Sequence, residues 1–147
     1  MSIFLQMIMN KRISKKLMKI YDELYQCYGP QHWWPGDTKT EIIVGAILTQ
    51  NTNWGNVEKA LLNLKKAKLL NFLALQRSST EKIAKLIQPS GYFNVKARRL
   101  KNFVQFFFKE YNGSWRKIQS EPLDVLRKKI FSVNGVGPET ADSILLY

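Results

Sequence analysis

Apolar residues recur at spacings of three and four along most of the chain, which is the period of an amphipathic helix. The first such segment runs from Arg12 to Tyr28, and Gly29-Pro30 is expected to end it. Its apolar positions are Ile13, Leu17, Ile20, Leu24 and Tyr28. No stretch alternates convincingly at period two, and Phe106–Phe108, the one strand-like run, lies inside a better helical pattern. The pattern therefore predicts an all-α fold.

A nearly uninterrupted apolar segment from Ile42 to Leu48 predicts a buried helix, and Thr38-x-x-Glu41 before it matches a capping box. Four later helices follow from the same kind of pattern. They are expected around 57–64, after a Ser78-x-x-Glu81 cap, after an Asn94 cap, and from Ser120 and Pro122 to about Phe131.

The sharpest local signal is the segment FSVNGVGPETAD, from Phe131 to Asp142. One helix runs into Gly135-Val136-Gly137, and Pro138 suits the first position of a second helix. Two glycines let the backbone turn tightly, and the unpaired amides of the turn and of the new helix favour an anion. The segment therefore predicts a helical hairpin with an anion site, which on DNA would hold a phosphate without reading a base. A tight helix–helix turn without a ligand is the alternative.

Composition adds a partner to this picture. Lys and Arg number 23 against 11 acids, for a formal net charge of +12 at pH 7, which favours a polyanion such as nucleic acid over a merely basic surface. Cys27 is the only cysteine, so that a disulfide within the chain is excluded, and it is expected to pack on its helix. Met1–Met9 fits neither a signal peptide nor a membrane span, so we expect a cytoplasmic protein without a membrane partner.

The hairpin resembles that of the HhH-GPD superfamily of DNA glycosylases, and two earlier segments resemble the same family. Residues 45–52 are similar to its early helix and glutamine-bearing loop, and residues 89–97 to its Gly-aromatic-x-x-Lys-Ala segment. The resemblance extends from about Leu17 to Tyr147 and is strongest to endonuclease III-related 3-methyladenine glycosylases. It implies an N-terminal extension, 1–11, and a partial endonuclease III-like, six-helix-type domain, 12–147, that ends inside the hairpin's second helix.

The resemblance also implies the chemistry. Bifunctional members carry a lysine nucleophile where this chain has Glu139, which cannot form an imine, so a monofunctional glycosylase acting on alkylated purines such as 3-methyladenine is expected. The family's catalytic aspartate lies in a loop beyond the hairpin, and neither Asp124 nor Asp142 matches it. It is therefore expected after Tyr147, and the 147 residues alone are expected to be inactive. An endonuclease III-like lyase acting on oxidised pyrimidines and a non-enzymatic DNA-binding module remain alternatives.

The resemblance assigns further residues to a base pocket, to DNA and to a cation. Trp33, Trp34 and Trp54 occupy pocket positions, where stacking of about 1–2 kcal/mol would favour a cationic methylated purine; anchoring of a loop is the alternative for one of the first two. The DNA-binding positions are Gln50, which fills the gap left by the flipped base, Lys96, Asn134, Gly135, Val136, Gly137, Glu139 and Thr140. The basic residues Lys96, Arg98, Arg99 and Lys101, and Arg127 to Lys129, are suited to phosphate contacts as a set.

The expected partner is double-stranded DNA containing damaged bases, bound by a monomer. The carbonyls of Phe131, Val133 and Val136 match those that bind a monovalent cation in some relatives. No other cofactor is expected in this chain, and an iron–sulfur cluster of the wider family would fall past Tyr147, so the sequence leaves it open.

Overall fold

Two units make up the chain in the computed structural model, Met1–Trp33 and Trp34–Tyr147. The structure describes residues 3–30 and 34–147, with the side chains of the first helix described from Arg12 onward. Within these ranges every regular element is a helix, as the sequence predicts. None of the described helices is both long and apolar enough to cross a bilayer.

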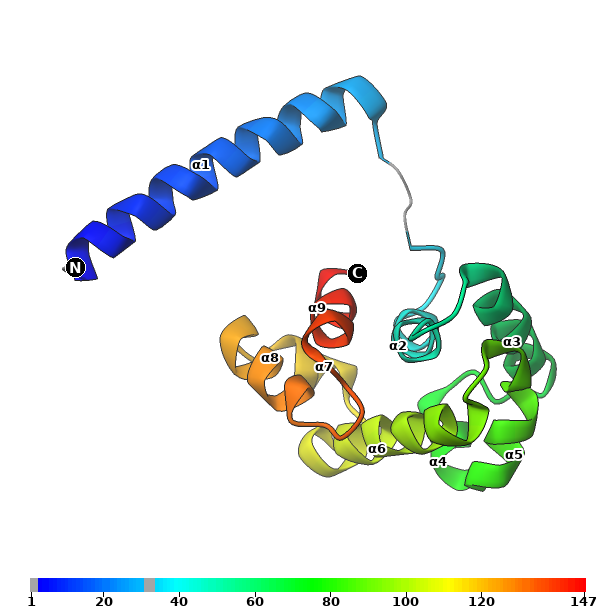
Figure 1. The fold of residues 1–147 in the computed structure, drawn as a ribbon. Helices are drawn as coiled ribbons and strands as arrows, with labels where there is room; N and C mark the ends of the chain where they lie inside the picture. Colours follow the sequence, from blue (N-terminus) through cyan, green and yellow to red (C-terminus); the bar gives the residue numbers. More distant parts are fainter. Residues whose placement is uncertain (1–2, 31–33) are drawn as a thin grey trace. The chain divides into compact units, whose positions relative to one another are not determined.

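The first unit contains the long helix α1, Ile3–Tyr28 (Figure 1). The predicted end at Gly29 is confirmed: Gly29 has a φ of +65° and its N–H donates to the carbonyl of Tyr25 at 2.8 Å. The helix begins before the predicted Arg12 and is continuous with the described part of the expected extension. Within this unit its apolar side chains are about half exposed or more and Cys27 is exposed, so the packing expected for Cys27 is not found within the unit.

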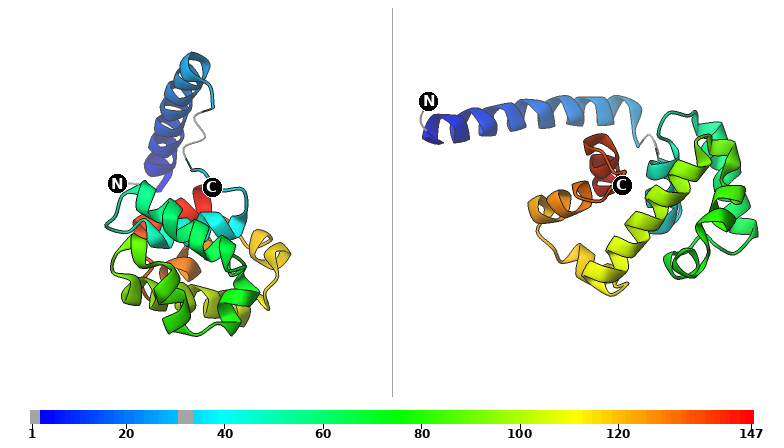
Figure 2. Two further views of the ribbon diagram at one scale, coloured as in Figure 1. Left: turned by 90° about the vertical axis from the view of Figure 1, so that its right-hand side faces the viewer. Right: turned by 60° about the horizontal axis from the view of Figure 1, so that its bottom comes forward.

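The second unit is a set of helices built around α2 (Figure 1). Their bounds are α2 Lys39–Leu48, α3 Trp54–Lys66, α4 Phe72–Arg77, α5 Thr80–Leu86, the 3-10 turn η1 Gln88–Ser90, α6 Phe93–Tyr111, α7 Trp115–Gln119, α8 Leu123–Phe131 and α9 Pro138–Leu146. Helix α2 contacts α3, α6 and α9, while α6 runs between the group α3–α5 and the group α7–α9 (Figures 1 and 2). Residues on α2 are therefore next to both halves of this unit.

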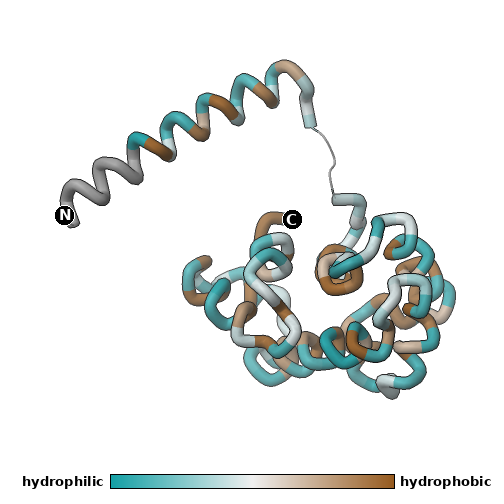
Figure 3. Tube along the Cα trace, in the orientation of Figure 1, coloured by the Kyte–Doolittle hydropathy of each residue, from teal (hydrophilic) through white to brown (hydrophobic). Residues whose placement is uncertain are grey.

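Helix α2 is buried because its sequence offers almost nothing to solvent after its first turn. Ile43 to Leu48 are all buried, as the apolar run predicts, and much of α2 has the colour of hydrophobic residues (Figure 3). Burying each large aliphatic side chain contributes about 1.5–3 kcal/mol. A second part of the core is aromatic, with ring centroids 4.5–5.9 Å apart among Phe72, Phe103, Phe107 and Trp115.

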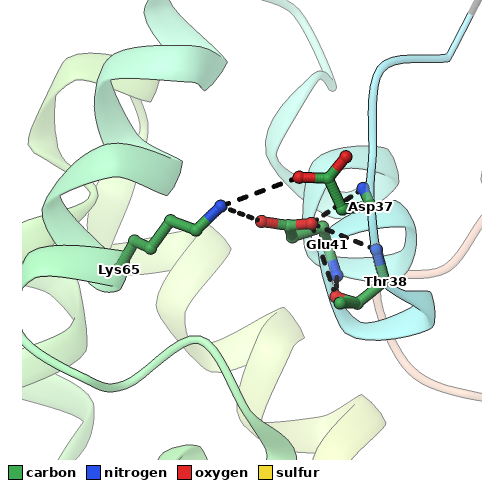
Figure 4. Close-up of polar contacts among 4 residues, drawn as sticks. All are labelled: Asp37, Thr38, Glu41 and Lys65. Carbon is green, nitrogen blue, oxygen red and sulfur yellow. Dashed lines mark hydrogen bonds and ion pairs between the residues drawn. The ribbon is translucent and has the colours of Figure 1, made fainter.

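The predicted capping box is confirmed at the start of α2 (Figure 4). Thr38 Oγ1 accepts from the amide of Glu41 at 3.2 Å, and Glu41 Oε2 accepts from the amides of Thr38 at 3.1 Å and Asp37 at 2.8 Å. Lys65 on α3 donates to the other carboxylate oxygen of Glu41 at 3.0 Å. Burial raises the pKa of Glu41, but the bonds from Lys65 and the two amides outweigh it and hold this pKa below its ordinary value.

Other helix starts differ from the sequence prediction by one or two residues. Ser79, not Ser78, caps α5, since its hydroxyl accepts from the amide of Lys82 at 3.2 Å. Helix α6 begins at Phe93 after Tyr92 in a left-handed conformation, so Asn94 lies inside the first turn instead of capping it. The hydrophobic pattern does not predict α4 and α7, which are only 6 and 5 residues long and too short to show a period.

Candidate nucleic-acid interface

The predicted helical hairpin is present between α8 and α9. Helix α8 ends at Phe131, Gly135 takes a φ of +93° in the turn, and Pro138 opens α9. A Cβ at position 135 would collide with the side chain of Arg99, so the turn needs glycine for both its conformation and this close packing. Gly137 brings no side-chain cap to α9, which leaves the amides of its first turn available to an anion.

One ion pair joins the two helices of the hairpin, and one hydrogen bond joins its turn to α6. Arg127 on α8 forms a bidentate ion pair with Asp142 on α9, with N···O distances of 2.6 and 2.9 Å. Asn102 on α6 donates from Nδ2 to the carbonyl of Asn134 at 3.1 Å, while the Asn134 residue itself is exposed. The hairpin is therefore fixed to α6 at one side of its turn.

The turn and the start of α9 line an open cavity of about 680 Å³ together with the end of α2 and the loop after it. Its lining is Ala46, Thr49, Gln50, Asn51, Arg99, Gly135, Val136, Gly137, Pro138, Glu139, Thr140 and Ser143. Six of the predicted DNA-binding residues thus share one cavity, although they come from segments about 85 residues apart in sequence: Gln50, Gly135, Val136, Gly137, Glu139 and Thr140.

Gln50 connects the α2–α3 loop directly to the hairpin. Its Nε2 donates to the carbonyl of Gly135 at 3.1 Å and to Thr140 Oγ1 at 2.9 Å. Its Oε1 accepts from Nη1 of Arg99 on α6. The side-chain amide therefore has both N–H groups and its oxygen engaged.

Lys96 lies in the interior, only 1% exposed. Its ammonium group donates to the carbonyl of Leu48, at the end of α2, at 2.8 Å and to the carbonyl of Ser90 at 2.5 Å. Burial, and then the charge of Arg99, lower its pKa. In this conformation Lys96 cannot contact a phosphate, so its expected place among the DNA-binding groups is corrected to one that fixes the end of α2.

The other basic residues divide into exposed and internally paired ones. Lys101 donates to the carbonyls of Leu75, Gln76 and Ser78 at 2.8–3.2 Å, at the end of α4. Lys129 is bound to Glu121, as Arg127 is to Asp142. Arg98 and Lys128 are exposed, and Arg98 lines a second polar cavity, of about 480 Å³, beside Gly135. These two are the better candidates for phosphate contacts.

Of the three tryptophans expected at a base pocket, Trp33 lies outside the described residues. Trp34 packs edge-on to Trp54, with ring centroids 5.3 Å apart, and stacks on Tyr147 at 5.4 Å. Gly45 makes room for both indoles, because a Cβ there would lie 3.3 Å from Trp54 and 3.4 Å from Trp34. Neither indole lines the 680 Å³ cavity, so the structure brings the two tryptophans together but apart from Gln50.

The indole nitrogens of the pair differ. Trp54 Nε1 donates to Glu58 at 3.0 Å, whereas Trp34 Nε1 is buried and has no hydrogen-bond partner among the described groups.

The monovalent-cation site expected at the hairpin stays a prediction. The carbonyl of Val133 accepts from the amide of Val136 at 3.0 Å, and its second lone pair is left for a cation.

Comparison with known proteins agrees with this geometry. Residues 44–138 match the family described as HhH-GPD superfamily base excision DNA repair protein. The chain is 47% identical over 133 residues to MJ1434 of Methanocaldococcus jannaschii, provisionally named a DNA repair glycosylase, covering 89% of this chain and 60% of that protein. It is 25% identical over 111 residues to endonuclease III homolog 2, chloroplastic, of Arabidopsis thaliana, covering 76% of this chain and 27% of that one.

Among solved structures, the chain is similar to the crystal structure of H. pylori 3-methyladenine DNA glycosylase (MagIII) bound to 1,N6-ethenoadenine. The TM-score is 0.72 and the identity 34%, over 90% of this chain and 61% of that one. The chain therefore spans about 60% of the length of the H. pylori and M. jannaschii proteins.

Proposed function

Because the chain belongs to the HhH-GPD superfamily of base excision DNA repair proteins, we propose that it is the DNA-binding part of a monofunctional DNA glycosylase acting on alkylated purines. The observation that carries this proposal is the shared cavity. The hairpin turn, the first turn of α9 and Gln50 line one open polar space. A phosphate on the hairpin amides would bring a neighbouring nucleotide to the same space.

Glu139 supports hydrolysis without strand cleavage. It is exposed in the first turn of α9 and lines the cavity, at the position where bifunctional relatives carry a nucleophilic lysine. A carboxylate cannot form the Schiff base that a lyase needs. Base release by this site would therefore leave an intact strand with an abasic sugar.

The paired indoles support an alkylated purine as substrate. A base that carries positive charge gains about 1–2 kcal/mol from stacking on an indole face. Trp34 and Trp54 are in contact, and the buried, unpartnered Nε1 of Trp34 is a donor that a ligand atom could satisfy. The MagIII structure holds 1,N6-ethenoadenine, a modified adenine without positive charge, so it supports a modified purine as substrate and not the preference for charge.

DNA binding is tested by measuring the affinity of the 147-residue chain for duplex DNA as a function of salt. Log affinity should fall with log salt at a slope of about −2 to −4, since each phosphate contact contributes about −0.9. Lys128→Ala should reduce the slope by about one contact, whereas Lys101→Ala should not, because Lys101 is bound to the end of α4. A salt-independent affinity would contradict the proposal.

Catalysis is tested with DNA that contains 3-methyladenine. Residues 1–147 alone should release no base, because family resemblance puts the carboxylate that stabilises the oxocarbenium-like sugar beyond them. A chimera extended with the corresponding C-terminal segment of MagIII should release it and leave alkali-labile sites. A protein–DNA adduct trapped with borohydride would show a lyase instead.

The pocket is tested in the same chimera. Trp34→Ala or Trp54→Ala should lower 3-methyladenine release about tenfold or more, while duplex affinity changes little. Equal losses of thermal stability and of base release would make the tryptophans loop anchors. Trp33→Ala belongs in the same series.

A further inference from the structure

The side chain of Gln50 has one orientation that satisfies all its neighbours. Its NH₂ group faces two acceptors, the carbonyl of Gly135 and the hydroxyl of Thr140, and its oxygen faces a guanidinium N–H of Arg99. Turning the amide over would place an N–H against the guanidinium and its oxygen against the Gly135 carbonyl. Both of these contacts would be repulsive, because arginine has no acceptor and a carbonyl has no donor.

Arg99 and the carbonyl of Gly135 together make this choice unambiguous, because the carbonyl only accepts. The Thr140 hydroxyl can donate as well as accept, so it would tolerate either end of the amide, whereas the guanidinium only donates. Arg99 is itself placed by the hairpin, since its aliphatic part lies directly over the α-carbon of Gly135, where a Cβ would collide with it. Gly135, Arg99 and Gln50 therefore fix one another from three segments of the chain.

We propose that Arg99 is a positioning residue that holds Gln50 in place for a DNA site that has lost its stacked base. The inference rests on the proposed function. A mobile glutamine that enters such a gap loses conformational entropy on binding, and this loss weakens the affinity. Gln50 is already ordered before DNA binds, so its binding does not carry this cost. Only a duplex with a gap gains affinity from an ordered Gln50. Arg99 should therefore raise the ratio of the affinity for a duplex with a gap to the affinity for an intact duplex.

The experiment compares two duplexes of the same sequence, one intact and one with a tetrahydrofuran abasic-site analogue, bound by the 147-residue chain at one salt concentration. The measured quantity is the ratio of the two dissociation constants. Arg99→Lys keeps the charge but shortens the side chain and loses the planar fork. It should reduce the ratio about five- to tenfold and change the affinity for intact duplex less than about twofold.

A double-mutant cycle separates positioning from direct contact with DNA. In a Gln50→Ala background, Arg99→Lys should cause no further loss of preference, because Arg99 has no glutamine left to hold. Thr140→Val, which removes one acceptor at nearly constant shape, should show the same dependence on Gln50 with a smaller loss. Arg99→Met, which keeps an aliphatic side chain beside Gly135 but has no donor, decides the question if Arg99→Lys does not fold. Arg116→Lys, at an exposed position on α7, is the matched control and should leave the ratio unchanged.

The outcomes distinguish the two proposals. If the wild-type chain binds no DNA, the proposed function is wrong and the inference falls with it. If it binds both duplexes equally, Gln50 does not recognise the gap, and the inference alone is overturned. If the wild-type chain prefers the abasic duplex and Arg99→Lys either keeps this preference or lowers it equally with and without Gln50, only the role of Arg99 is overturned.

Discussion

Opposite charges stabilise the two ends of α2. The two charged groups differ in their solvent exposure and in their distance along the sequence from the helix end that they bind. At the N-terminal end the carboxylate of Glu41 accepts from the amides of Thr38 and Asp37. At the C-terminal end the ammonium group of Lys96 donates to the carbonyl of Leu48. Each charge complements the helix dipole at its end.

The difference lies in solvent and in distance along the chain. The ion-pair partner of Glu41 is Lys65, whose side chain is 61% exposed, so water can replace part of this contact. Lys96 is only 1% exposed and lies 48 positions from Leu48 in the sequence. Water cannot readily take the place of its ammonium group at the Leu48 carbonyl. The contacts of Glu41 only stabilise the start of α2. The contact of Lys96 also fixes Leu48, two residues before Gln50, and so helps to place Gln50 beside the hairpin.

The largest effect is therefore expected at the buried end. Lys96→Met should lower the free energy of unfolding by about 3 kcal/mol or more, because the carbonyls of Leu48 and Ser90 lose a buried donor and each such loss costs about 1–3 kcal/mol. Urea unfolding followed by circular dichroism measures it. Lys101→Met is the matched control on the same helix, since Lys101 also binds carbonyls but is only partly buried. Equal losses for the two variants would refute the contrast.

The next largest loss of stability is expected at Gly135, in the turn of the hairpin. Gly135→Ala should cost about 1–3 kcal/mol, because position 135 has a φ of +93° and the new Cβ would collide with Arg99. Gly91→Ala, at a φ of +68° with open space around it, tests the backbone strain alone. Gly137→Ala has neither problem and should change stability by less than about 0.5 kcal/mol. A different order of thermal midpoints would contradict this account.

The two ends of α2 also show what could be predicted from sequence. Thr38-x-x-Glu41 and Pro138 each predict a helix start correctly, because a helix start depends on residues within four positions. The local pattern puts Lys96 and Arg99 in a basic run suited to phosphate contacts, because it counts charges without showing which face of the helix turns inward. One signal was present: Lys96 precedes Leu100 and Phe103 by four and seven positions, which puts it on the buried face of α6.

The contacts of Gln50 had no local signal at all. Its partners lie 49, 85 and 90 residues away and meet it only because α6 and α9 both pack on α2. The resemblance to a family assigned Gln50 and the hairpin to DNA, but not Arg99 to Gln50. Cavity sharing and hydrogen-bond partners are properties of the tertiary structure, which a sequence of one protein does not contain.

The local end of α2 should respond more weakly. Thr38→Ala should lower the free energy of unfolding by about 1 kcal/mol, which is the usual loss for an N-cap hydroxyl. Thr38 does not line the cavity beside the hairpin, so the affinity for duplex DNA should stay within about twofold. A loss of DNA affinity larger than the loss of stability explains would show that the two ends of α2 are coupled.

The smallest effect is expected from the charge of Glu41 itself, and it should depend on pH. The folded state holds the pKa of Glu41 below its ordinary value of 4.5, through Lys65 and the two amides, despite the opposing effect of burial. A carboxylate with a lowered pKa stabilises the fold above its unfolded pKa, and this stabilisation is lost as the pH falls through the folded pKa. Wild-type stability should therefore fall between about pH 5 and pH 3 more steeply than that of Glu41→Gln, which keeps an oxygen acceptor but does not titrate. Urea midpoints across this range measure the difference.

Lys65→Met should remove part of the same dependence of stability on pH. About 0.5 M salt should weaken the Lys65–Glu41 ion pair, because Lys65 is mostly exposed. Parallel curves for the wild type and Glu41→Gln would show that the charge at this end of α2 adds nothing beyond the hydrogen bonds.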